Sequence, residues 1–315
     1  GGAVERTTVD PVVLDGRGFT LTQTCPDNVV VQETVGAGLL TVQNITITGG
    51  QSTGSGGGIF AQGDLTVINS NIHTNHADQF GGGVAAIGTT TIESTTISGN
   101  DAAQGSAGVA GGLVVVITNS TVSNNLGGGV ASLPSEDATV TVVNSTITGN
   151  SDVDTGGGLF TGGTATLVYA TVVDNAANIA FDNIQTGIGL TSFGSVVAGG
   201  SADHSTCLFS AQSVSRGYNF SDDDSCNFTQ PTDRQDAGSP GLGALADNGG
   251  PTLTMLPGPA SPLIDAIPAG ACQDDGAAGV ATDQRGITRP QAVGCDIGAV
   301  EVEAVAVVVQ PTFTG

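Results

Sequence analysis

The acidic side chains are the residues of this chain that could do chemistry. Four aspartates follow shortly after a recurring asparagine and could share one edge of the fold: Asp78, Asp101, Asp152 and Asp154. His73 and His76 lie close to the first of them. Two carboxylates ~5 to 9.5 Å apart across a sugar ring are what a glycoside hydrolase requires. These aspartates are therefore the catalytic candidates if the protein is an enzyme, although acids at turns are more often simply solvated.

The asparagines that precede these acids recur at a fixed interval, which indicates how the acids are positioned. They lie 25 residues apart, at Asn75, Asn100, Asn125, Asn150 and Asn175. A fixed period of this length indicates stacked repeats. Asparagine tolerates left-handed backbone geometry at a turn, and its amide can bond to the amide of the next repeat. We therefore predict an internal asparagine ladder with a structural role.

Apolar residues follow the same period and predict the fold. One column consists of Ile47, Ile72, Ile97, Val122, Ile147, Val172 and Val197. Each repeat holds three short apolar stretches of period two, bounded by glycine or asparagine, which is typical of strands. Stacked repeats of equal length pair their strands in parallel, ~4.8 Å apart. The sequence therefore predicts an all-β parallel β-helix, a solenoid with about 25 residues per three-strand coil.

The departures from the period predict four segments. Residues 1–38 contain strand-like runs without the full repeat and are expected to form an N-terminal cap and the first irregular rungs. Residues 39–200 carry the regular repeats, although Val130 comes four residues early and Pro134 to Ala138 restore the count. Residues 201–300 are rich in proline and predict a loop-rich C-terminal cap. Residues 301–315 read as an apolar C-terminal strand.

Charge and cysteine content restrict the partners and the compartment. The net charge is −23, with 29 acidic residues against six basic ones. Such a charge disfavours nucleic acid and anionic membrane surfaces. Five cysteines are present, and two close pairs, Cys207–Cys226 and Cys272–Cys295, suggest disulfides and an oxidising compartment. Cys25 is left over, either as a buried thiol or as one half of an intermolecular bridge.

The sequence predicts no cofactor. Its glycine triplets lead from a turn into a strand, whereas a phosphate loop leads into a helix. None of the cysteines forms a Cys-x-x-Cys pair, so a metal site is not indicated. Asp222, Asp223 and Asp224 are weak calcium candidates, as are Asp274 and Asp275, but no twelve-residue calcium loop surrounds them. Arg285 and Arg289 are expected to pair with Asp265, Asp283 or Asp296 and to fix loops.

Several motifs resemble known families. The Gly-Gly-Gly-apolar and Ser-Thr-Ile-x-Gly-Asn elements resemble polymorphic outer-membrane-protein repeats and other pectate-lyase-like right-handed parallel β-helices. Five ordered motifs in 217–226, 242–252, 256–266, 282–286 and 289–299 resemble the end of bacterial choice-of-anchor Q domain proteins. The resemblance implies a secreted or surface-anchored right-handed β-helix. It does not imply one activity, and no Arg or Lys lies between Gly18 and Ser215 to serve as the basic group of a lyase.

These observations favour a non-catalytic extracellular protein with a structural or adhesive role at the cell surface. Its expected partners are surface glycans and further copies of itself, joined head to tail into filaments through the ends of the rod and the C-terminal strand. The assembly residues would be Val305, Val307, Val308, Val309 and Phe313. Binding or degradation of a polysaccharide is the alternative.

A third alternative is ice binding, because outward hydroxyls form a grid. Its two columns are Thr46, Asn71, Thr96, Thr121, Thr146 and Thr171, and Thr48, His73, Ser98, Ser123 and Thr148. His73 and Val173 interrupt the second column, and outward threonine is in any case favourable in a strand.

Overall fold

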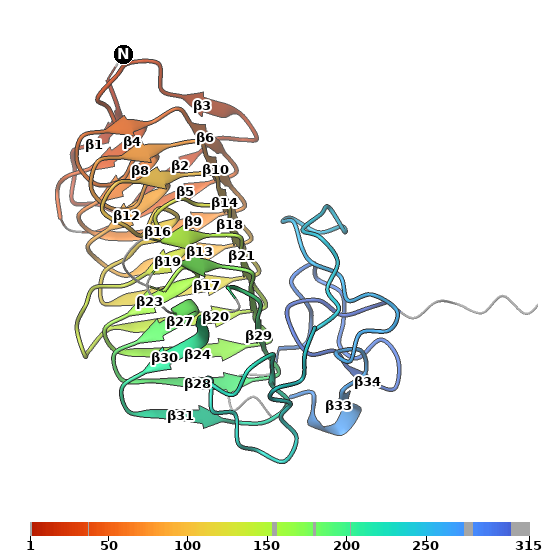
Figure 1. The fold of residues 1–315 in the computed structure, drawn as a ribbon. Helices are drawn as coiled ribbons and strands as arrows, with labels where there is room; N and C mark the ends of the chain where they lie inside the picture. Colours follow the sequence, from red (N-terminus) through yellow and green to blue (C-terminus); the bar gives the residue numbers. More distant parts are fainter. Residues whose placement is uncertain are drawn as a thin grey trace, which may run out of the picture.

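The chain coils into a rod of parallel β-sheets with a loop-rich C-terminal domain packed along one side (Figure 1). The structure is a computed structural model, and it describes residues 2–36, 38–152, 156–178, 181–201, 203–273 and 280–303. Three sheets, here named A, B and C, each contain nine strands, one from each turn of the coil. The predicted all-β parallel solenoid is therefore confirmed.

Sheet A forms one face of the coil. Its strands, in spatial order, are β1 (Val4–Arg6), β4 (Val31–Glu33), β8 (Ile59–Ala61), β12 (Val84–Ala86), β16 (Val109–Ala110), β19 (Val130–Ala131), β23 (Leu159–Thr161), β27 (Phe181–Thr186) and β30 (Ser205–Phe209). Val109 pairs with Val130, and Val130 pairs with Leu159. The early position of Val130 is thus absorbed by a change in loop length, and the register of the sheet is kept.

Sheet B forms the second face and contains the longest regular strands. They are β2 (Val12–Asp15), β5 (Leu39–Gln43), β9 (Asp64–Ile68), β13 (Thr90–Glu93), β17 (Val114–Thr118), β20 (Thr139–Val143), β24 (Thr164–Val168), β28 (Gly189–Phe193) and β31 (Gln212–Ser215).

Sheet C forms the third face. It consists of β3 (Thr20–Thr22), β6 (Thr46–Thr48), β10 (Asn71–His73), β14 (Thr96–Ser98), β18 (Thr121–Ser123), β21 (Thr146–Thr148), β25 (Thr171–Val173), β29 (Val196–Ala198) and β32 (Phe220–Ser221). The first strands of all three sheets come from residues 4–22, so the N-terminal segment takes part in the coil.

Short strands complete the structure. Beside sheet C run β7 (Gln51–Ser52), β11 (His76–Ala77) and β15 (Asp101–Ala102), followed further along the rod by β22 (Ser151–Asp152) and β26 (Ala176–Ala177). In the C-terminal domain, β33 (Ile267–Pro268) pairs antiparallel with β34 (Gly294–Cys295), and η1 (Ala269–Ala271) is a single 3₁₀ turn. No helix among the described residues has the length and apolarity that a membrane span needs.

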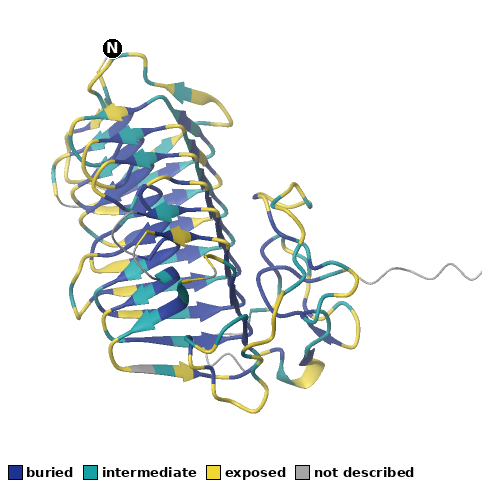
Figure 2. Cartoon of the chain, viewed as in Figure 1, coloured by how far each residue is buried: buried dark blue, intermediate teal, exposed yellow. Residues whose placement is uncertain are grey.

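The predicted apolar column forms the core of the rod. Ile47 pairs with Ile72, Ile72 with Ile97, and Ile97 with Val122. All of these side chains are fully buried, and the strands of the coil are coloured largely as buried in Figure 2. Each coil therefore buries its apolar face only against its two neighbours, as a repeat architecture requires.

The five asparagines form a continuous buried ladder. Asn100 Nδ2 donates to Asn125 Oδ1 at 3.0 Å, and Asn125 Nδ2 donates to Asn150 Oδ1 at 2.8 Å. The last member, Asn175, donates to Asn183 Oδ1 at 2.9 Å, only eight residues along the chain. Each amide also donates to a strand carbonyl, as Asn125 does to Ile97. The buried polar groups are thereby paired with one another.

The glycine triplets are required by this ladder. A Cβ added to Gly83 would lie 2.9 Å from Asn100 Nδ2 and 2.7 Å from the carbonyl oxygen of Gly108. A Cβ on Gly108 would lie 3.0 Å from Asn125 Nδ2. The glycine directly before the sheet A strand, which is the third of a triplet at Gly83 and a single glycine at Gly108, thus leaves the space in which the asparagine amide lies.

The C-terminal domain is held by disulfides and by buried arginines. Both predicted disulfides are confirmed, Cys207–Cys226 in the last coil and Cys272–Cys295 in the C-terminal domain. Cys25 is half-buried near the start of the rod, so the expectation of a buried thiol is only partly met.

The predicted arginine pairs are half correct. Arg285 pairs with Asp283 at 2.9 Å, as expected. Arg289 instead pairs with Glu301 at 2.9 Å and lies 4.2 Å from the ring centroid of Tyr169. Burial lowers the pKa of Arg289, although the Glu301 carboxylate opposes that shift. The prediction failed because Glu301 was assigned to the apolar tail, whereas it is buried inside the domain.

Candidate binding and catalytic sites

The sequence-predicted acids come together only in part. His76 lies between two of them: its Nδ1 is 2.7 Å from Asp101 Oδ2, and its Nε2 is 3.1 Å from Asp78 Oδ1. Partial burial lowers the pKa of His76, but the hydrogen bonds to both carboxylates outweigh it and raise the pKa above its ordinary value. Since a carboxylate only accepts hydrogen bonds, the doubly protonated imidazolium satisfies both contacts at once. This cluster is a partly exposed ion-paired group on β11 and β15.

Asp152 does not join that cluster. It is buried on β22 and pairs in register with Ala177, whereas Asp101 is bridged to Leu126 and Leu126 to Ser151. Asp152 therefore belongs to the neighbouring column, two coils further along the rod. Asp154 lies outside the described residues. The expectation that these acids share one edge was wrong for Asp152, because adjacent strand positions point to opposite faces.

The outward hydroxyls of sheet C are divided into a covered and an uncovered part. Thr121 Oγ1 donates to the carbonyl oxygen of Leu253, Thr146 Oγ1 donates to Gln284 Oε1 at 2.7 Å, and Thr171 Oγ1 accepts from the Ala299 amide at 3.0 Å. All three threonines are buried. The C-terminal domain therefore lies on the second half of the predicted grid, and an open grid along the whole rod was wrong.

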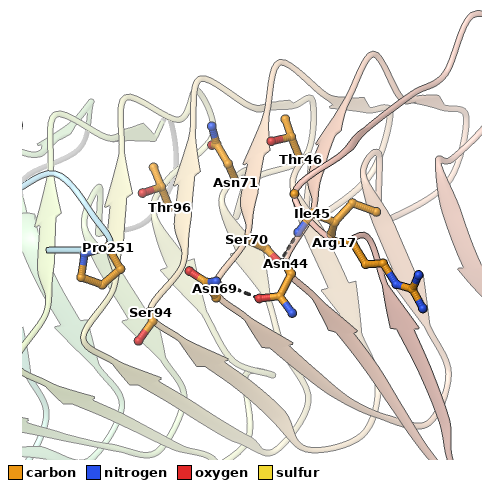
Figure 3. Close-up of a pocket in the computed structure, with 11 residues that line it drawn as sticks. Arg17, Asn44, Ile45, Thr46, Asn69, Ser70, Asn71, Ser94, Thr96 and Pro251 are labelled. Carbon is orange, nitrogen blue, oxygen red and sulfur yellow. Dashed lines mark hydrogen bonds between the residues drawn. The ribbon is translucent and has the colours of Figure 1, made fainter.

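The first part of the same face remains open and forms a polar groove of about 450 Å³. Figure 3 shows its two rows of side chains, one from strands β6, β10 and β14 and one from the turns that precede those strands. The strand row is Thr46, Asn71 and Thr96, and the turn row is Asn44, Asn69 and Ser94. Arg17 lies at one end, and Pro251 of the C-terminal domain lies at the other.

The turn row is held in place by left-handed backbone and by hydrogen bonds. Asn44, Asn69 and Ser94 have φ values of 52°, 46° and 49°. Asn69 Nδ2 donates to Asn44 Oδ1 at 2.8 Å, and Asn44 Nδ2 donates to Asp15 Oδ1 at 3.2 Å. The Arg17 backbone amide is the main hydrogen bond that lowers the pKa of Asp15. None of the described residues that line the groove is acidic, in contrast to the strongly acidic chain as a whole.

A second cavity lies on sheet A, which we call the apolar trough, with a volume of about 640 Å³. Its floor is the outward row of five successive strands: Phe60, Ala85, Ala110, Ala131 and Phe160. The walls are loops on either side, one with Gln79, Phe80 and Gln104 and the other with Ile87, Leu133 and Pro134. The strand row of the polar groove belongs to the predicted hydroxyl grid, whereas sequence reasoning missed the trough, although the three alanines at outward strand positions were a readable signal for it.

The calcium candidates serve as backbone caps. Asp222 Oδ2 accepts from the Gly199 amide at 2.7 Å, and Asp223 Oδ2 accepts from the Thr206 amide at 2.9 Å. Burial raises the pKa of Asp223, but hydrogen bonds from Ser225 and Thr206 outweigh it and lower the pKa overall. Over the described residues, no group of three or more His, Cys, Asp or Glu side chains is arranged to hold a metal ion. Asp274 and Asp275 lie outside the described residues.

Comparison with known proteins agrees with this architecture. The model of the family described as "Right handed beta helix region" matches residues 17–197, which is more than half of the chain. The chain therefore belongs to the right-handed β-helix family.

One solved structure is similar, that of pectate lyase Pel9A, with 12% identity and a TM-score of 0.40 over 93% of this chain and 86% of the lyase. No curated protein sequence matches the chain. The two disulfides indicate a non-cytoplasmic protein.

Proposed function

We propose that this protein is a non-catalytic extracellular surface protein that adheres to uncharged glycans through the polar groove on sheet C. The observation that carries the proposal is the pair of polar rows in the groove. Their hydroxyls and amides repeat at the strand spacing of ~4.8 Å. A polymer of hydroxyl-bearing units meets equivalent donors and acceptors on successive coils.

The contacts on the covered half of the same face support the proposal that the ligand is uncharged. There, Thr121 binds a backbone carbonyl, Thr146 a glutamine side chain and Thr171 a backbone amide. The open rows carry the same chemistry, so they suit partners with hydroxyl, amide or carbonyl groups. Anionic polysaccharides are disfavoured because the protein carries a net charge of −23.

A binding role also fits the position of the acidic residues. Asp78 and Asp101 are paired through His76, and Asp152 lies in another column. The resemblance of residues 217–299 to choice-of-anchor Q domain proteins supports a location at the cell surface. Ice binding is not part of the proposal, because the C-terminal domain lies on the regular half of the threonine grid.

The test is a glycan array followed by titration of the best uncharged oligosaccharide. We expect Thr96→Ala and Asn71→Ala each to weaken binding about two- to tenfold, the value of one lost hydrogen bond. Thr91→Ala is the matched control, because Thr91 is a half-exposed threonine of the same coil on sheet B. Absence of binding to every uncharged glycan, or equal weakening by Thr91→Ala and Thr96→Ala, would contradict the proposal.

A further inference from the structure

The apolar trough on sheet A has several exposed, large apolar side chains on its walls. Ile87 is 59% exposed, and Phe80 and Leu133 are each 44% exposed, all on its walls. Contiguous exposed apolar surface of this kind marks interaction sites in soluble proteins. The chain has 29 acidic residues, yet Asp152 is the one acidic residue among the described residues that line the trough, and it is buried.

We propose that the apolar trough of one molecule binds residues Ala304–Val309 of a second copy. This segment, with the predicted assembly residues up to Phe313, lies outside the described residues; it reads Ala-Val-Ala-Val-Val-Val, and residues 304–315 contain no Asp, Glu, Lys or Arg. Trough and segment are thus both nearly free of charge in a molecule of net charge −23. Association through an acidic part of the surface brings like charges into direct contact, whereas this contact does not.

The dimensions agree with an extended segment. The floor crosses five strands from Phe60 to Phe160, which is four spacings or ~19 Å. Six residues in extended conformation span ~20 Å. The three alanines between the two phenylalanines leave room above the floor for valine side chains.

The rim supplies partners for the backbone of the bound segment. An extended chain that lies along the rod cannot pair with the strands of sheet A, because their amides and carbonyls are already paired with neighbouring coils. The side-chain amides of Gln79 and Gln104 stand on one wall. Each amide offers both donors and an acceptor, as a peptide backbone requires.

The contact joins two molecules. Glu303, which precedes the segment, belongs to the C-terminal domain, and this domain lies beside the rod (Figure 1) and packs on sheet C. The trough lies on sheet A. A tail and a trough on different faces make a heterologous contact, which generates open chains unless the geometry closes. The inference is independent of glycan binding, because it uses another face of the coil.

Sedimentation velocity over a concentration series tests the proposal on the full chain, on a chain that ends at Glu303, and on the variant Ile87→Asp. We expect the full chain to associate, the shortened chain to stay monomeric, and Ile87→Asp to weaken association at least tenfold. Because Ile87 is exposed on a loop, the variant is expected to fold normally. Val214→Asp on sheet B is the matched control and should associate like the unmodified chain.

A labelled peptide of residues 303–315 provides the second arm. It should bind the shortened protein in fluorescence anisotropy, and at least tenfold more weakly when Ile87→Asp is introduced. A monomeric full chain, association that survives the deletion or Ile87→Asp, or equal loss in Val214→Asp would overturn the proposal. So would a shortened protein that binds an apolar dye in the trough but fails to bind the peptide.

Discussion

Gln284 Nε2 donates a hydrogen bond to Thr121 Oγ1 at 2.8 Å, across 163 residues of sequence. The same amide donates to Thr252 Oγ1 at 2.9 Å and to the carbonyl oxygen of Ser120 at 3.1 Å, while Gln284 Oε1 accepts from Thr146. One buried side chain therefore joins the C-terminal domain to two strands of the rod. Thr146 Oγ1 has its hydrogen bond with this glutamine, whereas Thr121 Oγ1 also bonds to the Leu253 carbonyl and the Ser120 carbonyl also accepts from the Thr146 amide.

We accordingly expect Gln284→Ala to destabilise the docked domain by about 3 kcal/mol, because it removes several buried hydrogen bonds and leaves the Thr146 hydroxyl without its acceptor. Tyrosine fluorescence during urea unfolding measures this, since Tyr169, which donates to the Cys272 carbonyl at 2.7 Å, reports on the docked state. Gln230→Ala, on an exposed loop, is the control and should leave the transition unchanged. A transition equal to that of the unmodified protein would show that the glutamine contributes little to docking.

The asparagine ladder yields a second prediction. Asn125→Ala removes the acceptor of the Asn100 amide and the donor to the Ile97 carbonyl, all buried. We expect a loss of about 3 kcal/mol in the free energy of unfolding of the rod, because the groups left behind are unsatisfied. Asn71→Ala changes an exposed asparagine on β10 and should cost less than about 1 kcal/mol. Urea unfolding followed by far-UV circular dichroism compares the two variants.

The position of His76 between two carboxylates predicts a dependence on pH. Its folded-state pKa is raised above the ordinary value of 6.5, so its stabilising effect is complete below that pH and is lost as pH rises through the folded-state pKa. The cluster is partly exposed, so we expect the effect to stay below about 1 kcal/mol. His76→Gln should flatten the fall in stability above pH 6.5. His73→Gln, in which the lost contacts are to the hydroxyls of Thr48 and Thr74, should retain it.

The two disulfides stabilise different parts of the molecule. Replacing Cys272 and Cys295 by serine should destabilise the C-terminal domain by about 3 kcal/mol, because its closing loop spans 23 residues. Replacing Cys207 and Cys226 should instead loosen the last coil. Hydrogen exchange resolved by mass spectrometry distinguishes the two effects. Equal loss of protection over the whole rod in the first variant would show that the domain and the rod unfold as one unit.

The rod could be predicted because each of its contacts repeats. Ile72, Ile97 and Val122 are neighbours in space for the same reason that they are 25 residues apart in sequence, so the period alone gives strands, register and core. The four-residue offset at Val130 was also readable, since the count is restored by Ala138. The period was less informative at the end of the ladder. There the partner of Asn175 is Asn183, which follows it by only eight residues instead of 25.

The docking of the C-terminal domain could not be predicted in this way. Gln284 and Thr121 are joined by a single irregular contact, and no period links them. Outward threonines in a covered strand and in an open strand have the same sequence pattern, so Thr96 and Thr121 look alike until the domain is placed. The polar groove exists because the covering stops near Pro251, a boundary that no local pattern indicates.

The place where the covering stops also has a consequence for evolution. The domain is attached to β18, β21 and β25, so coils added between Asn44 and Ser94 would leave its attachment untouched. Each duplication of a 25-residue unit by recombination would lengthen the open groove by one strand spacing, ~4.8 Å. Gene-level changes in copy number would thus adjust the length of the groove, and with it the length of glycan that the proposed site accepts, while the attachment of the domain stays constant.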